Sequence, residues 1–90
     1  MQRNESADKL FEAILTLKDK DECYKFFSDA CTLKEIQTIA QRYMVAKMLN
    51  DKCVYSEIIA ATGASTATIS RVSRSIDDGY KMVFERLKDK

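Results

Sequence analysis

Residues Tyr55–Ile76 read YSEIIAATGASTATISRVSRSI, and this stretch decides the fold that we expect. Ile58 and Ile59 supply the apolar face of a short first helix. Gly63 follows directly, where the end of a helix favours a residue that tolerates positive φ. Ser65 then offers a hydroxyl group that can cap the free N–H groups of a second helix. The stretch therefore predicts two short helices joined by a glycine turn.

The second of these helices divides into an apolar side and a small polar side. Ile69, Val72 and Ile76 recur at helical spacing on the apolar side. The other side carries Thr66, Ala67, Ser70, Arg71 and Arg74. Small hydrogen-bonding side chains suit a helix that enters the major groove of DNA, whereas Ser and Thr are weak helix formers that a purely structural helix would not favour. The pattern predicts a helix-turn-helix at about residues 55–76, with an ordinary helix–helix corner as the alternative.

The composition indicates a small all-α chain. We assign its 90 residues to a single domain, residues 1–90. Proline is absent, glycine occurs only twice, and apolar residues repeat with a helical period, which predicts about six helices joined by short turns. A chain of this size has a marginal core, so association with a partner is a plausible source of stability.

The first third of the chain predicts two helices with large apolar surfaces. Ser6 is expected to cap a first helix that runs to about Leu17, and Asp19 or Asp21 is expected to cap the next. The second helix carries adjacent phenylalanines at positions 26–27, which spread apolar surface over more than one face. We interpret these helices as part of a dimer core; packing within one monomer is the alternative.

A third and longer helix is expected in the middle of the chain. Thr32 and Glu35 form a capping box at its start, and it runs to about Asn50 before a turn at residues 50–52. Its broad apolar face is expected to consist of Ile36, Ile39, Ala40, Tyr43, Met44 and Met48. Residues 77–79 then end the helix-turn-helix or begin a last amphipathic helix. The apolar residues of that last helix are Tyr80, Met82, Val83, Phe84 and Leu87.

The charge balance does not by itself indicate a nucleic-acid partner. The chain has 15 basic and 14 acidic side chains and a net charge of +1, whereas nucleic-acid-binding domains are often strongly positive. Between residues 52 and 76 the balance of charge is more favourable to binding a nucleic acid. The charged residues there are Lys52, Arg71, Arg74 and Glu57. Because a few well-placed residues make the phosphate contacts, this local excess matters more than the sum, although acids at positions 77–78 partly cancel it.

Nothing in the sequence predicts a metal site, a cofactor or an enzyme. Cys23, Cys31 and Cys53 form no CxxC pair and no histidine could complete a zinc site, so we expect buried thiols in a reducing cytosol. The sequence has no glycine-rich phosphate loop and no nucleophile beside an obvious base. No signal-like segment or bilayer-length apolar run is present, so the protein is expected to be soluble and cytoplasmic, with no membrane partner.

The run GASTATISR at residues 63–71 resembles the recognition helix of the bacterial Trp repressor family, and most closely the related proteins of the YerC/YecD type. The resemblance extends back through TLKE at 32–35 and RYMVA at 42–46. It implies an all-helical, intertwined homodimer in which the N-terminal helices of the two subunits interlock. Such a dimer places two recognition helices about one DNA turn apart and suits a palindromic site.

The resemblance also implies roles for individual residues. Those placed near base edges are Ser65, Thr66, Ala67 and Ser70, and those placed near phosphates are Thr68, Arg71 and Arg74. Ser56 belongs to the same DNA-binding set, although it stands where the repressor has an arginine, and Ile59 stands where it has a lysine. Thr32, Arg42 and Arg71 match positions near the effector or the phosphate backbone. A solvated surface arginine is the alternative for Arg42.

The resemblance further bears on tryptophan binding. The repressor's pocket depends on an Arg-Gly pair in the recognition helix, because the glycine leaves space beside the indole ring. Here the pair reads Arg71-Val72, and valine is expected to fill that space. Forcing a ring into a filled core costs on the order of 1–3 kcal/mol, which lowers affinity by roughly tenfold to over a hundredfold. L-tryptophan is therefore not expected as a ligand, while a different, smaller effector stays open.

These observations predict a sequence-specific, double-stranded-DNA-binding transcriptional regulator, repressor-like, that uses residues 65–76 as its recognition helix. The alternative is a helical protein-interaction module that has kept this shape and lost DNA binding. The near-neutral charge, the acids at 77–78 and the missing arginine at Ser56 favour that alternative.

Overall fold

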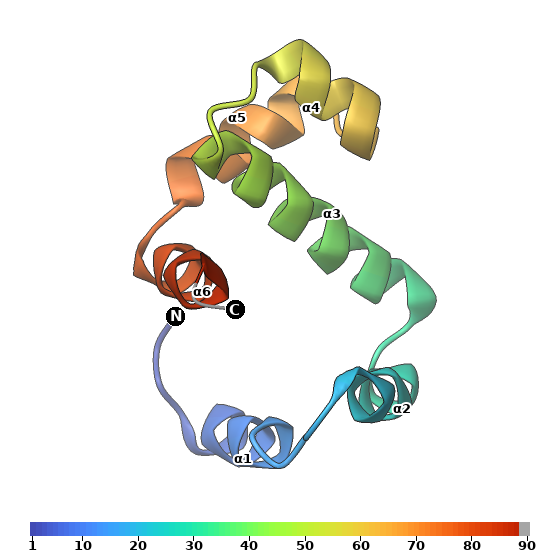
Figure 1. Cartoon of the computed structure of the whole chain (residues 1–90). Coiled ribbons are helices and arrows are strands. Elements are labelled where there is room, and N and C mark those ends of the chain that lie inside the picture. Colours follow the sequence, from blue (N-terminus) through green and yellow to red (C-terminus); the bar gives the residue numbers. More distant parts are fainter. Residues whose placement is uncertain (89–90) are drawn as a thin grey trace. The chain divides into compact units, whose positions relative to one another are not determined.

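The computed structural model describes residues 1–88, which form six α-helices and no strand (Figure 1). The helices are α1 (Glu5–Ile14), α2 (Lys20–Ala30), α3 (Leu33–Asn50), α4 (Tyr55–Thr62), α5 (Thr66–Ser75) and α6 (Asp78–Lys88). The all-α prediction is confirmed. The chain divides into two compact units, Met1–Leu33 and the part that begins at Lys34. The assignment of residues 1–90 to one domain stays a prediction.

In the N-terminal unit, α1 begins earlier and ends earlier than the sequence suggested. The cap is Asn4, whose side-chain Oδ1 accepts a hydrogen bond from the Ala7 N–H at 2.8 Å, so the expected Ser6 cap is wrong. Asn4 has the extended backbone that a cap requires, which places Ser6 inside the first turn. At the other end the Leu17 N–H bonds to the Ile14 carbonyl, which tightens the chain into a turn after Ile14.

The second helix, α2, is capped by Asp19 rather than Asp21. The Asp19 Oδ1 accepts from the Glu22 N–H at 2.9 Å, and the Glu22 carboxylate in turn accepts from the Lys18 N–H at 2.9 Å. These reciprocal bonds satisfy backbone donors at the start of the helix in the manner of a capping box.

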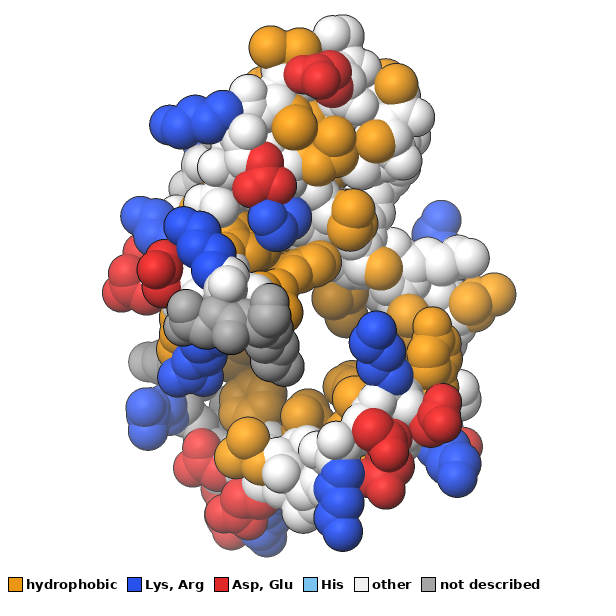
Figure 2. All heavy atoms as spheres, viewed as in Figure 1, with side chains coloured by type: hydrophobic (Ala, Val, Ile, Leu, Met, Phe, Trp, Pro, Cys, Tyr) orange, Lys and Arg blue, Asp and Glu red, His pale blue; other side chains and the backbone are white. Residues whose placement is uncertain are grey.

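The N-terminal unit buries none of the residues of its two helices. Leu15 is 84% exposed and Tyr24 is 75% exposed, and hydrophobic side chains lie between charged ones over α1 and α2 in the space-filling view (Figure 2). The phenylalanines at 26–27 pack edge to face, with ring centroids 5.1 Å apart. Cys23 is also exposed, so the expectation of a buried thiol is wrong at this position. The reason is that α2 buries none of its residues. This unit therefore presents an apolar surface to solvent.

The second unit contains the core. Its buried residues are Val45, Ala46, Ile58, Ala64, Ile69, Val72 and Phe84, contributed by α3, α4, α5, α6 and the turn between α4 and α5. The predicted apolar face of α3 is wrong in part, since Ile39 and Met44 are 55% and 47% exposed. The helix is apolar on more than one side, and the side that carries Val45 and Ala46 is the one that α4, α5 and α6 cover.

The turn between α4 and α5 is held by four hydrogen bonds. Gly63 has φ +70°, as predicted, and its N–H bonds to the Ile59 carbonyl at 2.9 Å. The Thr62 hydroxyl donates to the Ile58 carbonyl at 2.8 Å and accepts from the Ala64 N–H at 3.2 Å. The Gln41 Nε2 of α3 donates to the Thr62 carbonyl at 3.1 Å. The end of α4 is thereby satisfied and fixed to α3.

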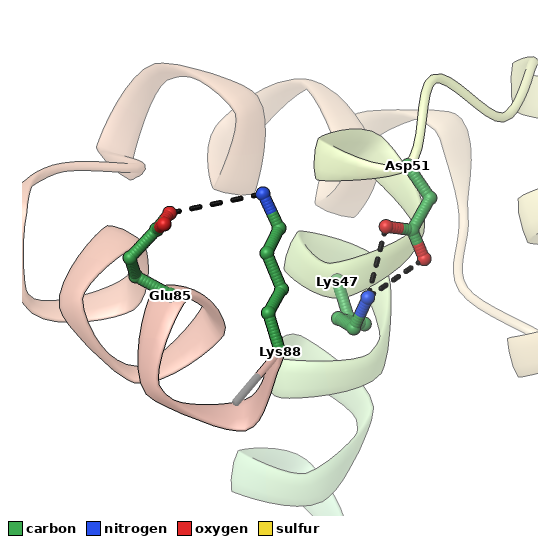
Figure 3. Close-up of polar contacts among 4 residues, drawn as sticks. All are labelled: Lys47, Asp51, Glu85 and Lys88. Atoms are coloured by element: carbon green, nitrogen blue, oxygen red, sulfur yellow. Dashed lines mark hydrogen bonds and ion pairs between the residues drawn. The ribbon is translucent and has the colours of Figure 1, made fainter. Parts of the chain in front are cut away.

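The last helix, α6, packs through an aromatic group against α3. The rings of Tyr80 and Phe84 stack at 5.8 Å, and the Tyr43 ring of α3 lies 5.8 Å from that of Phe84. The ammonium of Lys47 lies 5.7 Å from the Phe84 ring centroid. The same ammonium pairs with Asp51 at 2.9 Å (Figure 3). Because the ion pair is partly exposed, we assign the stability of this contact mainly to the rings.

The two glycines provide a matched test of the turn. Gly63→Ala should destabilise the fold by roughly 1–2 kcal/mol, because alanine at φ +70° is strained even in open space. Gly79→Ala should instead stabilise it by up to about 1 kcal/mol, because this glycine lies in α6 with open space around it. Urea unfolding of both variants measures the difference; equal effects would contradict the assigned role of Gly63.

Candidate nucleic-acid interface

The packing of α5 decides which of its side chains face solvent. Ile69 is fully buried and Val72 is 4% exposed, so the side predicted to be apolar does face the core. The opposite side is open. Its exposed residues are Thr66, Ala67, Arg71 and Arg74, and Thr68 and Ser70 are half-buried. We call Thr66, Ala67, Ser70, Arg71 and Arg74 the exposed face of α5.

Two of the predicted DNA-contacting hydroxyls are engaged at the start of α5. The Ser65 Oγ accepts from the Thr68 N–H at 3.1 Å, which confirms Ser65 as the cap, and it also donates to the Thr68 Oγ1 at 3.1 Å. The donors of Ser65 and of the Thr68 backbone are therefore used inside the protein. Within the described residues, the hydroxyls of Thr66 and Ser70 have no partner. Thr66 and Ser70 are thus better placed than Ser65 to bond to another molecule.

The charged residues of α5 are all basic. The helix has no acidic residue, and Arg71 and Arg74 form no ion pair within residues 1–88. The one acid of α4, Glu57, accepts from the Val54 N–H at 3.0 Å at the start of that helix. Acids at positions 77–78 are exposed immediately after α5. The exposed face of α5 can therefore offer two unpaired guanidinium groups to an anion.

The remaining predicted site residues lie outside α5. Ser56 is exposed in the first turn of α4. Arg42 is exposed in α3 and has no ion pair among the described residues. Thr32 lies just before α3, in the N-terminal unit. The grouping of Thr32 with Arg42 and Arg71 as an effector site stays a prediction.

The sequence analysis did not single out two residues that support the candidate interface. Ala64, 2% exposed, is the small residue between the turn and the cap of α5, and Gln41 bonds across to α4. A larger side chain at Ala64 would overpack the core to which it belongs. The position of Ala64 between Gly63 and Ser65 could have indicated its role, whereas nothing in the local sequence pattern distinguishes Gln41.

No group of three metal-binding side chains gathers anywhere in the part of the chain that the structure describes. Over that same part, none of the helices has the length and apolarity needed to cross a bilayer.

The candidate interface is built from α4, α5 and the turn between them.

Comparison with known proteins places this chain in a family. Residues 5–88 match the family model described as Trp repressor protein. The chain belongs to the Trp repressor family. This is a family of regulators rather than enzymes. According to the resemblance, Val72 stands at the position of the repressor's glycine. Val72 is a core residue here, so its side chain occupies buried space.

Relatives of the chain share most of its length. It is 51% identical to the uncharacterized protein YerC of Bacillus subtilis (strain 168), over 97% of this chain and 86% of that protein. The crystal structure of a TrpR like protein from Eubacterium eligens ATCC 27750 matches with a TM-score of 0.92 and 54% identity, over 96% of this chain and 92% of that one. A candidate Trp repressor from Staphylococcus aureus matches with a TM-score of 0.91 and 48% identity, over 98% and 91%. The Trp-repressor-like, all-α fold is thereby established.

The cap assignment predicts that Ser65 acts through stability. Ser65→Ala should cost about 1 kcal/mol of folding free energy, because the Thr68 N–H loses its acceptor. Ser65→Asp should keep most of the stability, since aspartate caps equally well and favours the helix N-terminus. Ser73→Ala, an exposed serine of the same helix, is the control and should be neutral or slightly stabilising. Thermal unfolding measures all three; an unchanged melting temperature for Ser65→Ala would contradict the cap.

Proposed function

We propose that this protein is a repressor-like transcriptional regulator that binds double-stranded DNA sequence-specifically through α5. The observation that carries the proposal is the division of α5, which buries Ile69 and Val72 and leaves a small hydroxyl and methyl surface with two unpaired arginines. Membership of the Trp repressor family supports it. The site of action that we propose is the bacterial cytoplasm, where the DNA is.

In this proposal α5 enters the major groove with its N-terminal half leading. The residues of that half that are not in the core have short side chains, so the backbone of α5 can approach base edges closely. Arg71 and Arg74, further along the helix, bond to phosphates and fix the register. Thr68 and Ser56 are further phosphate candidates through their hydroxyls, and Ser65 serves the interface by capping α5.

The proposed bond between Arg71 and a phosphate predicts a uniform decrease in affinity when the arginine is removed. Arg71→Ala should weaken binding to every duplex by roughly tenfold, the effect of removing one charge-assisted hydrogen bond. The slope of log affinity against log salt should fall by about 0.9 for each phosphate that the protein no longer neutralises. The matched control is Arg86→Ala, which changes an exposed arginine of α6. This substitution should leave the affinity and the salt slope unchanged. Fluorescence anisotropy over a salt series measures the effect on an operator selected from random duplexes.

The outcome of that selection also tests the alternative. If the intact protein binds no duplex at low salt, the helical interaction module becomes the better explanation, in keeping with the net charge of +1 and the exposed acids at 77–78. If it binds DNA but Arg71→Ala and Arg86→Ala behave alike, α5 is the wrong helix.

We also propose that the protein acts as a homodimer whose N-terminal helices interlock. The supporting observation is energetic: α1 and α2 bury no residue in their own unit, although Leu10 and Phe11 are each 45% exposed and Leu15 far more so. Moving a fully exposed side chain of this size into a core contributes about 1.5–3 kcal/mol, and a side chain that is already half covered contributes roughly half of that. A second copy supplies an identical apolar surface and brings two α5 helices to successive major grooves.

The dimer makes a prediction about mass. Sedimentation equilibrium at micromolar concentration should give twice 10.3 kDa. Phe11→Asp should shift the protein toward the monomer, because a buried carboxylate would replace an apolar contact. Glu12→Ala, an exposed acid of the same helix, should leave the dimer intact. A single species of 10.3 kDa for the unmodified protein would contradict the proposal.

Finally, we propose that the regulator does not respond to L-tryptophan. Val72 is 4% exposed and packs with Ile69 in the core, so an indole ring would have to displace it. Isothermal titration calorimetry should detect no L-tryptophan binding at micromolar concentrations. Val72→Gly, checked for folding by circular dichroism, is the variant in which affinity should first appear. Micromolar affinity of the unmodified protein would overturn this proposal.

A further inference from the structure

We propose that the methyl groups of Thr66 and Ala67 select thymine in the operator, by apolar contact with its C5-methyl group in the major groove. This inference rests on the proposed function and assigns the specificity of the same interface to two residues. Both residues are exposed in the first turn of α5, the part of a recognition helix that meets base edges.

The hydrogen bonds at the start of α5 leave few groups there for contacting bases. The Ser65 hydroxyl both accepts from the backbone and donates to the Thr68 hydroxyl, so its single hydrogen is used. Thr68 is half-buried and its hydroxyl accepts that bond. The first turn therefore offers the side chains of Thr66 and Ala67, which together contain two methyl groups and one hydroxyl.

The base chemistry that such groups can recognise is narrow. Bidentate contacts to guanine need arginine or lysine, and bidentate contacts to adenine need asparagine or glutamine. None of these residue types occurs in α5 before Arg71. A hydroxyl can bond to more than one base, so the Thr66 and Ser70 hydroxyls discriminate weakly. The C5-methyl of thymine is the one base feature in the major groove that an alanine or threonine methyl group recognises by contact.

The two arginines lie further from the leading end of α5 than the methyl groups do. Arg71 lies four residues after Ala67, one turn further along the helix, and Arg74 lies almost another turn beyond. Both have long side chains without ion pairs among residues 1–88, which suits phosphates beside the groove. The positively charged groups therefore supply affinity, and the methyl groups supply the preference for thymine.

The test compares thymine with deoxyuridine, which pairs identically but lacks the C5-methyl. An operator selected from random duplexes is resynthesised with deoxyuridine at its thymines, and the affinity of the 90-residue chain is measured by anisotropy at one salt concentration. Binding should weaken about fourfold for each thymine methyl group that the protein can no longer touch. Thr66→Ser removes one protein methyl and keeps the hydroxyl, so it should reduce this thymine preference. Thr66→Val keeps a methyl in place and removes the hydroxyl, so it should retain the preference.

The outcomes separate this inference from the proposed function. Strong duplex binding with equal affinity for thymine and deoxyuridine, or a selected operator without thymine at the contacted steps, overturns the inference and leaves the DNA-binding function standing. Absence of binding to any duplex overturns both. If the preference for thymine over deoxyuridine persists undiminished in Thr66→Ser, the methyl group of Thr66 does not supply it and the inference is wrong for that residue. Ala67→Ser, checked for folding by circular dichroism, should reduce the preference independently of Thr66.

Discussion

The burial of one side of α5 in the core that it shares with α3, α4 and α6 is the constraint on which the rest of the structure depends. Ile69 and Val72 are held with Val45 and Ala46 in a single core, and Ile58 joins them from α4. A ten-residue helix rich in serine and threonine is only marginally stable alone in water, so this packing is what makes α5 a helix. The same packing turns the opposite side to solvent. Stability and the proposed recognition are therefore two consequences of one contact.

The sequence predicted well those features that nearby residues determine. The positive φ of Gly63, the Ser65 cap and the apolar side of α5 all follow from residue types within one or two turns, and each is present in the structure. Prediction failed where two neighbouring residues could both cap a helix. It also failed where contacts with residues distant in sequence determine which side of a helix is buried. Asn4 and Ser6 can both cap a helix, and the sequence did not favour the correct one. The buried side of α3 depends on where α4, α5 and α6 pack, which no window of sequence contains.

The two units differ in how they obtain stability. In the second unit, the seven buried residues among those that the structure describes and the ring contacts of α6 form a core within one chain. In the first, caps at Asn4 and Asp19 define the helix starts, but hydrogen bonds of this kind contribute only about 1 kcal/mol each. Such caps specify where a helix begins, but they do not bury an apolar side chain such as Leu15, which stays exposed. The apolar surface of α1 and α2 is therefore the strongest structural support for a second copy.

The small net charge has a consequence for how the proposed regulator would discriminate between DNA sequences. Sequence-independent affinity for DNA grows with the number of phosphates that a protein neutralises. With Arg71 and Arg74 as the unpaired cations of α5 and a net charge of +1, this component is modest. Weak attraction to random duplex lowers the competition from the rest of a genome, and the specificity ratio matters more than affinity alone. A recognition surface of small methyl and hydroxyl groups is compatible with that balance, because each contact is weak and only a correctly shaped groove satisfies all of them together.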